Sequence, residues 1–416
     1  MDTNMIEKDE DKNIYVIENN WQAFHPVESC GGPCEIKIDN KSIITDIRSS
    51  ISGIEDTQCI TRKVKEYHKA GQSVVESEGY LPFGGESEFK QTSRYHKNLL
   101  RVTQDINFRH GTTVNRHFSV GSLNLKGKYE AFTVIPPAQH QTEGSEPYTR
   151  EIPDWKGKEI MIGHWHRPPL AIIFHRKDGI DIEVGTGFDI WRWEENLGYH
   201  PESGSYKIKL KEKSLEFTRE PLACCEDFTP EQRNYRFTWH IAWNNDKKKL
   251  TVPQHKKLYI PFKNAGQEVD FERLKKSLAE SSEENTYLYF NIHRGLSWPD
   301  NALAVPSSQA FCCGLVSDEL CWQSPVIIRR LKKIMRRVSE MDGFNGLILE
   351  GIHPGICYHP SHIERKNVMG LAHWDINPIF DFLSWIDNHA KDKFKIFLKP
   401  DEEERLALPS LEGFFK

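Results

Sequence analysis

Alternation of apolar and polar residues dominates the first 245 positions of the chain. Residues 100–108 and 235–243 alternate in this way, and side chains two apart on a strand share one face. Residues 206–217 carry the same pattern with a polar break at 211–214, which predicts a hairpin. Many short strands without an amphipathic helix between them predict a large antiparallel β-sandwich over residues 1–245, for which a supersandwich-like form is one option. Trp239 and Trp243 lie on an apolar face and are expected in the core.

The pattern changes after a polar stretch at residues 244–249, which we interpret as a linker. Apolar residues then recur at intervals of four, three and four between Ile327 and Val338, as on one face of a helix. Asn377 followed by Pro378 is typical of a helix start. Short apolar runs at 287–292, 346–349 and 394–398 separate the helical segments. Alternating strands and helices predict a small open α/β domain with a mostly parallel sheet over residues 246–416.

Composition narrows the classes of partner and the expected location. Lys and Arg number 55 and Asp and Glu number 60, so the net charge of −5 makes nucleic acid an unlikely partner. No apolar run reaches the ~18 residues of a membrane helix, so we expect no membrane partner. The N-terminus lacks the pattern of a signal peptide, and the nine Cys include adjacent pairs at 224–225 and 312–313. We therefore expect mostly reduced thiols and a cytoplasmic location.

Eleven Trp residues make an aromatic ligand site plausible, and residues 188–195 (FDIWRWEE) are its best candidate. As a strand, this segment places Asp189, Trp191, Trp193 and Glu195 on one face. Indole rings stack on the C–H faces of sugars, and carboxylates accept hydrogen bonds from hydroxyls. Trp191 and Trp193 are therefore predicted to bind a saccharide. A second packed face or an interface between protein parts is the alternative interpretation.

Ionisable residues near this segment could supply the chemistry. Imidazoles that alternate along a strand can act as a general base or as metal ligands, and two carboxylates on one strand face can do acid and base work on a glycosidic bond. Asp181 and Glu183 alternate with Ile180, Ile182 and Val184 and so should leave the core side. The predicted acid/base candidates are His164, His166, Glu183 and Glu194, and the predicted anion-binding residues are Arg167 and Arg192.

A second group of candidates follows the apolar runs of the α/β half. Ligands of open α/β sheets bind beyond the carboxyl ends of the strands. Arg294, Glu350 and His353 follow two of the predicted strands, and the loop after them adds further imidazoles up to His373. Glu350 and His353 could act as an acid/base pair while Arg294 holds an anion. The same cluster could instead bind a divalent metal or be structural.

These patterns together favour an enzyme that acts on a glycan or sugar derivative by hydrolysis or elimination, with its site on the β-sandwich near the domain boundary. Its partner would be a saccharide or another polar small molecule, and it would need no cofactor. One alternative is a metal-dependent hydrolase that uses a divalent metal at residues 353–373. Another is a non-catalytic binding or assembly protein. The sequence leaves the substrate and the oligomeric state open.

Overall fold

The computed structural model describes most of the chain, with gaps. The described residues are 5–18, 20–28, 32–51, 54–55, 59–81, 87–108, 117–135, 147–152, 159–162, 169, 171–186, 205–220, 222–223, 234–244, 256–281, 286–292, 296–304, 320–352, 356–357, 359, 362, 373–374, 376–390, 393–399 and 410. The chain forms two compact units. The first comprises Met1–Pro137 and Thr142–Asn245, and the second comprises Ala138–Gln141 and Asp246–Lys416.

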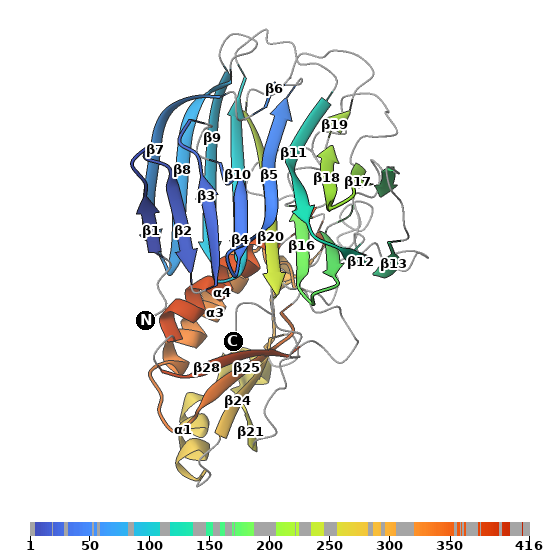
Figure 1. Cartoon of the computed structure of the whole chain (residues 1–416). Coiled ribbons are helices and arrows are strands. Elements are labelled where there is room, and N and C mark those ends of the chain that lie inside the picture. Colours follow the sequence, from blue (N-terminus) through green and yellow to red (C-terminus); the bar gives the residue numbers. More distant parts are fainter. Residues whose placement is uncertain are drawn as a thin grey trace. The chain divides into compact units, whose positions relative to one another are not determined.

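The first unit contains an eleven-stranded antiparallel sheet (Figure 1). Its order is β1 (Met5–Lys8), β2 (Ile14–Glu18), β3 (Trp21–His25), β4 (Glu35–Ile38), β5 (Lys41–Ile51), β11 (His117–Lys126), β18 (Ser214–Glu220), β17 (Ser205–Leu210) and β14 (Glu159–Ile162). Two short strands extend it, since β6 (Ile54–Glu55) pairs with β5 and β19 (Leu222–Ala223) pairs with β11.

The second sheet of this unit is also antiparallel and has nine strands. Its order is β13 (Tyr148–Glu151), β12 (Tyr129–Ile135), β15 (Ala171–Arg176), β16 (Asp181–Thr186), β20 (Asn234–Asn244), β10 (Leu99–Asn107), β9 (Ser87–His96), β8 (Gln72–Leu81) and β7 (Ile60–Lys69). The central pair β10–β20 joins residues that lie far apart in the chain, for example Asp105 and Arg236.

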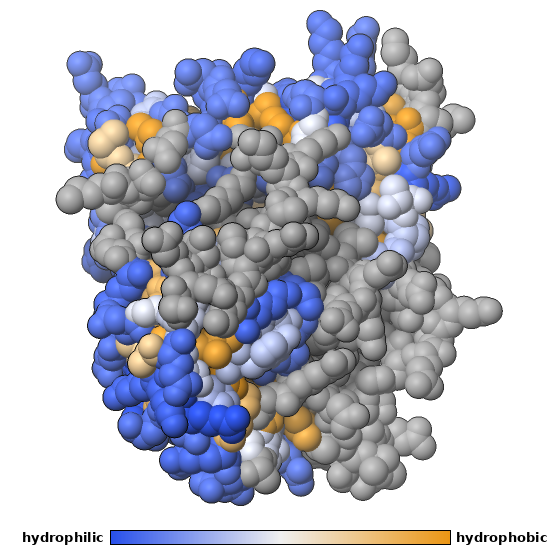
Figure 2. Space-filling view, turned by 90° about the horizontal axis from the view of Figure 1, so that it is seen from below, coloured by the Kyte–Doolittle hydropathy of each residue, from blue (hydrophilic) through white to orange (hydrophobic). Residues whose placement is uncertain are grey.

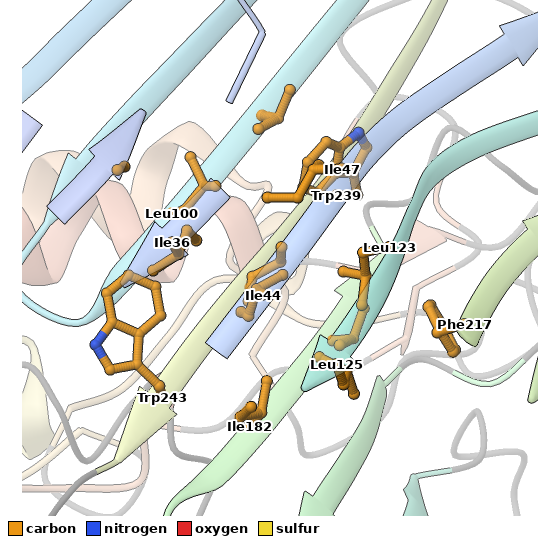
Figure 3. Close-up of a cluster of buried hydrophobic side chains, with 14 of the residues drawn as sticks. Ile36, Ile44, Ile47, Leu100, Leu123, Leu125, Ile182, Phe217, Trp239 and Trp243 are labelled. Atoms are coloured by element: carbon orange, nitrogen blue, oxygen red, sulfur yellow. The ribbon is translucent and has the colours of Figure 1, made fainter. Parts of the chain in front are cut away.

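The two sheets bury one continuous hydrophobic core between them. Figure 3 shows Ile44 and Leu123 of the eleven-stranded sheet in one buried cluster with Leu100, Trp239 and Trp243 of the nine-stranded sheet. The two tryptophans are only 1% and 0% exposed, which confirms their expected place in the core. The large antiparallel β-sandwich predicted from the alternation is therefore the observed fold of this unit.

A buried chain of polar groups crosses the core between the sheets. The backbone N–H of Gly121 donates to Ser49 Oγ at 2.9 Å, and that hydroxyl donates to Gln104 Oε1 at 3.0 Å. The Gln104 amide in turn donates to Gln91 Oε1. Gly121 has a φ of +58°, and a Cβ at this position would lie 2.7 Å from the Trp239 ring. Both the backbone conformation and the close approach of the indole therefore require glycine.

Gly121→Ala is expected to lower the free energy of unfolding by about 2 kcal/mol or more, because it adds a strained φ and a clash with Trp239. Urea unfolding followed by tryptophan fluorescence measures this cost. Gly343→Ala is the matched control, since Gly343 has a φ of +90° but its Cβ would meet only Leu278 Cβ at 3.8 Å. Equal costs for the two variants would show that the clash contributes nothing.

The second unit is built on a four-stranded parallel sheet in the order β21 (Lys256–Tyr259), β24 (Thr286–Asn291), β25 (Gly346–Glu350) and β28 (Lys395–Lys399). Its helices are α1 (Phe271–Ala279), α3 (Pro325–Val338) and α4 (Ile376–Ala390), with short 3-10 turns η3 (Asn264–Gly266) and η4 (Asp300–Ala302). Two small pairs complete it, β22 (Phe262–Lys263) with β23 (Glu268–Val269), and β26 (Ile356–Cys357) with β27 (His373–Trp374).

The predicted helix face from Ile327 to Val338 is buried in α3, and α4 begins one residue before the expected Asn377. The three predicted strands are β24, β25 and β28, and all their pairings are parallel. The small α/β part predicted after the sandwich is thus observed. Helix α1 was not predicted, although Asp270 caps it by accepting from the backbone N–H of Arg273 at 3.1 Å.

Large apolar side chains reach the surface of the described residues only at sheet margins. Figure 2 shows a face on which hydrophobic residues form small patches among hydrophilic ones. The exposed large hydrophobic residues are Met5, Ile60, Tyr148, Met161 and Tyr259, and each lies on a strand at the end of its sheet order. Among the described helices, none combines the length and the apolar character that crossing a membrane requires.

Four cysteines are described, and they differ in state. Cys34, Cys321 and Cys357 form no disulfide, whereas Cys59 is disulfide-bonded. A disulfide is more typical of an oxidising compartment than of the cytoplasm. The cytoplasmic location inferred from the sequence stays a prediction.

Candidate functional site

Strand β16 carries the two carboxylates that the sequence analysis placed on one face. Ile182 and Val184 point into the sandwich core and are fully buried, so Asp181 and Glu183 project from the opposite face of the nine-stranded sheet. Each carboxylate contacts an imidazole from a different neighbouring strand.

Glu183 pairs with His240 of β20, and the distance from Glu183 Oε1 to His240 Nε2 is 2.6 Å. The two side chains are 0% and 2% exposed, so this is a wholly buried carboxylate–imidazole pair. His240 lies opposite Gly185 in the β16–β20 register, and a Cβ on Gly185 would lie 2.0 Å from the His240 ring. Glycine at position 185 is therefore what allows the imidazole to lie flat over β16 and reach Glu183.

Asp181 pairs with His175 of β15, with 2.9 Å between Asp181 Oδ1 and His175 Nδ1. The other ring nitrogen, Nε2, is 2.8 Å from Thr133 Oγ1 on β12, and that hydroxyl is 2.8 Å from Thr149 Oγ1 on β13. Since a carboxylate can only accept, Nδ1 carries the proton in this pair and a neutral ring accepts from Thr133 through Nε2. In the order carboxylate, imidazole, hydroxyl, the carboxylate can orient the imidazole and the imidazole can take a proton from the hydroxyl.

A buried cation shares this face. Arg101 of β10 is 5% exposed and is the cross-strand partner of His240. Cross-strand partners project from the same face of a sheet, so the guanidinium belongs to the same polar surface as the two carboxylate–imidazole pairs. The face away from the core thus combines acid, base and cation within four neighbouring strands.

The sequence analysis did not single out His240 or Arg101. Each occupies a polar position in an alternating strand, and nothing in the local pattern separates it from an exposed neighbour. Only strand pairing reveals them, because the β16–β20 pair brings residue 240 next to residue 183 and the β10–β20 pair brings residue 101 opposite residue 240. The Glu at position 183 was predicted as a catalytic candidate, and that role stays a prediction.

Most other predicted residues of the sandwich site lie outside the described residues. They are His164, His166, Arg167, Trp191, Arg192, Trp193 and Glu194.

A polar pocket lies on the other sheet, across β5, β11 and β18. Its lining includes Asp46, Arg48, Ser119, Asn124 and Glu216, and it contains none of the predicted site residues. Hydrogen bonds from Asn124 and Thr45 outweigh burial and lower the pKa of Asp46. Its carboxylate is thus charged at neutral pH and already engaged by its neighbours.

At the carboxyl edge of the parallel sheet, Asn291, Glu350 and Lys399 lie in one cross-strand row. Lys399 Nζ is 2.8 Å from Glu350 Oε1 and 3.1 Å from the Tyr289 hydroxyl, and the Asn291 amide donates to Glu350 Oε2 at 2.6 Å. The three parallel strands thus deliver polar groups to one edge, as the position of Glu350 in the sequence indicated.

The hydrogen bonds in this row decide the charge of Glu350. Burial alone would raise the pKa of its carboxyl, but hydrogen bonds from Lys399, Tyr289 and Asn291 outweigh it, and the pKa is lowered. The bond to Glu350 raises the pKa of Lys399, and burial together with Glu350 raises the pKa of Tyr289 to about 12. Glu350 is therefore a fixed anion at neutral pH, suited to accepting hydrogen bonds rather than to giving up a proton.

The other two residues predicted at this edge, Arg294 and His353, lie outside the described residues. The catalytic role of Glu350 and His353 and the anion-binding role of Arg294 stay predictions.

Comparisons with known proteins name no family for this chain. No family model matches it, and no curated protein matches it. Solved structures do align. The α-galactosidase AgaB of glycoside hydrolase family 36 from Geobacillus stearothermophilus is 9% identical, with 99% of this chain and 74% of that chain covered and a TM-score of 0.38.

Two further alignments involve other proteins. A family 97 glycoside hydrolase from Pseudoalteromonas sp. strain K8, in complex with acarbose, is 9% identical over 95% of this chain and 66% of that chain (TM-score 0.33). A putative aldose 1-epimerase from Escherichia coli K12 is 8% identical over 58% of this chain and 99% of that chain (TM-score 0.33). Glycoside hydrolases and an aldose epimerase are thus among the aligned structures, but at these TM-scores no argument about this chain rests on them.

Gly185→Ala is expected to displace the His240 ring and to lower the free energy of unfolding by about 1–3 kcal/mol. A double-mutant cycle with His240→Ala separates the clash from other effects, because removing the ring makes room for the new methyl group. The cost of Gly185→Ala should then largely disappear in the His240→Ala background. An undiminished cost there would contradict the proposed contact.

Glu350→Gln is expected to lower the free energy of unfolding by about 1–3 kcal/mol near neutral pH. The pKa of Glu350 is lower in the folded protein, so its carboxylate stabilises the fold above the unfolded pKa of about 4.3, and that contribution is lost as the pH falls. The difference between wild type and Glu350→Gln should therefore shrink between about pH 5 and about pH 3.

Urea unfolding at a series of pH values measures this difference. Glu272→Gln is the control, since the Glu272 side chain is 87% exposed and 4.0 Å from Lys275. A difference for Glu350→Gln that stays constant with pH would rule out the ionised pair with Lys399.

Proposed function

We propose that the chain is a carbohydrate-processing enzyme that acts on a glycan or sugar derivative by hydrolysis or elimination, with its site on the polar face of the nine-stranded sheet. The observation that carries the proposal is the presence of two carboxylate–imidazole pairs, Asp181–His175 and Glu183–His240, side by side on that face. Proton transfer to and from a sugar oxygen or carbon needs such groups, and imidazole and carboxylate are the side chains best suited to it.

The roles differ because the environments differ. Glu183 and His240 are buried, so a substrate reaches them only through a group that contacts them. The His175 and Asp181 side chains are 25% and 31% exposed, so a sugar hydroxyl can approach them directly. Arg101, in register with His240, adds a positive charge to the same face, and this charge favours an acidic sugar.

The sequence supplies the sugar platform that this chemistry needs. Trp191 and Trp193 follow β16 within a few residues and alternate with Arg192, a pattern typical of stacking on a sugar ring next to a polar contact. We include both tryptophans in the proposed site, together with Arg167, His164, His166 and Glu194. A saccharide, acidic or neutral, is the proposed partner, and this mechanism needs no cofactor.

The test is an activity screen of the purified full chain. Chromogenic glycosides report hydrolysis, and polyuronides report elimination through the ultraviolet absorbance of the unsaturated product. Glu183→Gln and His240→Gln should each lower kcat about 100-fold or more on whichever substrate is turned over, because proton transfer typically contributes 10²–10⁴-fold. Asp105→Asn is the matched control, since Asp105 forms a partly exposed ion pair with Arg236 on the same sheet.

The pH profile separates a chemical role from a structural one. If Glu183 and His240 take part in proton transfer, Glu183→Gln removes or shifts one limb of the kcat profile of the protein that remains folded. A uniform loss of activity that follows the loss of folded protein, with an unchanged pH profile in the remainder, would contradict the proposed role. Retention of activity in both variants would contradict it as well.

A further inference from the structure

A cluster of two thiols and an imidazole lies in the second unit, away from the row at Glu350. It consists of Cys321, Cys357 and His362, all of them buried, whose sulfur and ring-nitrogen atoms lie within 4.8 Å of one another. Neither cysteine forms a disulfide, in a chain where Cys59 is disulfide-bonded. Thiol sulfur and imidazole nitrogen are the ligand atoms of structural zinc sites.

The distances match those around a tetrahedral zinc ion. With Zn–S near 2.3 Å and Zn–N near 2.0–2.1 Å, a sulfur and a nitrogen on one zinc lie about 3.6 Å apart. The observed distance from Cys357 Sγ to His362 Nδ1 is 3.6 Å. Thiolate and imidazole ligands are also the set that zinc prefers among the common protein metals.

The tautomer of His362 can be deduced from its other contact. His362 Nε2 is 2.8 Å from the backbone oxygen of Asn301. A carbonyl oxygen only accepts, so Nε2 carries the proton, and in the neutral ring Nδ1 keeps its lone pair on the side of Cys357. A ligand histidine whose second ring nitrogen donates to a backbone carbonyl is the usual arrangement at metal sites.

The backbone around the cluster supports a thiolate. The N–H of His359 donates to Cys357 Sγ at 3.3 Å, which favours the charged form of the sulfur that metal binding needs. The backbone N–H of Cys321 donates to Ala302 at 2.9 Å, and its carbonyl accepts from Ser324 just before α3. The ligands are therefore held by η4, the start of α3 and the turn after β26.

We propose that Cys321, Cys357 and His362 bind a structural Zn²⁺ ion that ties the turn after β26 to the start of α3. The described residues supply three of the four ligands of a tetrahedral site. The burial of all three groups indicates a closed site, in which the ion stabilises the fold and does not bind substrate.

Metal analysis of the full chain, purified without chelator, tests the proposal. We expect about one zinc ion per chain in the wild type and background levels in Cys357→Ser and His362→Ala. Cys34→Ser is the matched control, since Cys34 is a free thiol of the β-rich unit, and it should keep its zinc. Zinc that persists in both cluster variants, or a different metal in stoichiometric amount, would overturn the assignment.

Cobalt substitution tests the site without any variant, so a folding defect in the variants cannot hide the result. Wild-type protein stripped of metal and titrated with Co²⁺ should develop the intense visible bands of tetrahedral cobalt and a thiolate-to-cobalt charge-transfer band. Saturation at about one equivalent, reversed by added Zn²⁺, is the expected result. Absence of zinc from the wild type together with absence of the charge-transfer band would overturn the proposal.

Discussion

Face-to-face burial of two large antiparallel sheets is the constraint on which the first unit depends. Alternating side chains from both sheets fill one core, and Trp239 and Trp243 are among its largest fully buried side chains. The Trp239 ring occupies the space that a Cβ at position 121 would take. Glycine is therefore the residue that fits at this position. The same packing buries the polar chain from Gly121 to Gln91, which links the sheets in one relative position.

Strict alternation on β16 also explains how one strand serves both the core and the proposed site. Ile182 and Val184 hold the strand against the core, and the residues that alternate with them are thereby directed to the opposite face. A mutation that slipped the register by one residue would bury the carboxylates in the core and expose the aliphatic side chains. The carboxylates of the proposed site are thus positioned by a strand that is anchored in the core.

At the carboxyl edge of the parallel sheet, the buried carboxylate of Glu350 has surroundings that differ from those of Glu183. Glu350 is surrounded by donors, and this environment keeps it charged. Glu183 instead lies against the imidazole of His240, a side chain that can both give and take a proton. Two buried glutamates that look alike in sequence therefore have different chemical capacities.

Local periodicity was sufficient to predict β10, β20, the β17–β18 hairpin, α3 and the parallel strands, because each depends mainly on neighbours in the chain. It could not predict pairing between distant residues, such as Glu183 with His240.

The thiol–imidazole cluster was missed in part for the same reason. His362 and Cys357 lie in a histidine-rich loop that drew attention, but Cys321 comes from a segment 36 positions earlier and showed no local signal. Helix α1 was missed although its capping residue, Asp270, is present.

The strand order also determines when, during synthesis of the chain, the nine-stranded sheet can form. In the β10–β20 pair, Asp105 bonds to Arg236, 131 residues later. At about 5–20 residues per second, the ribosome needs about 7–26 s to make the intervening chain. During that time the edge of β10 that later pairs with β20 has no partner from its own chain. This edge can pair with another nascent chain instead. Pairing between distant strands makes folding slow, and an open strand edge makes aggregation sensitive to protein concentration. We therefore expect chaperones or slow expression to raise the yield of native protein, even though the folded core is well packed.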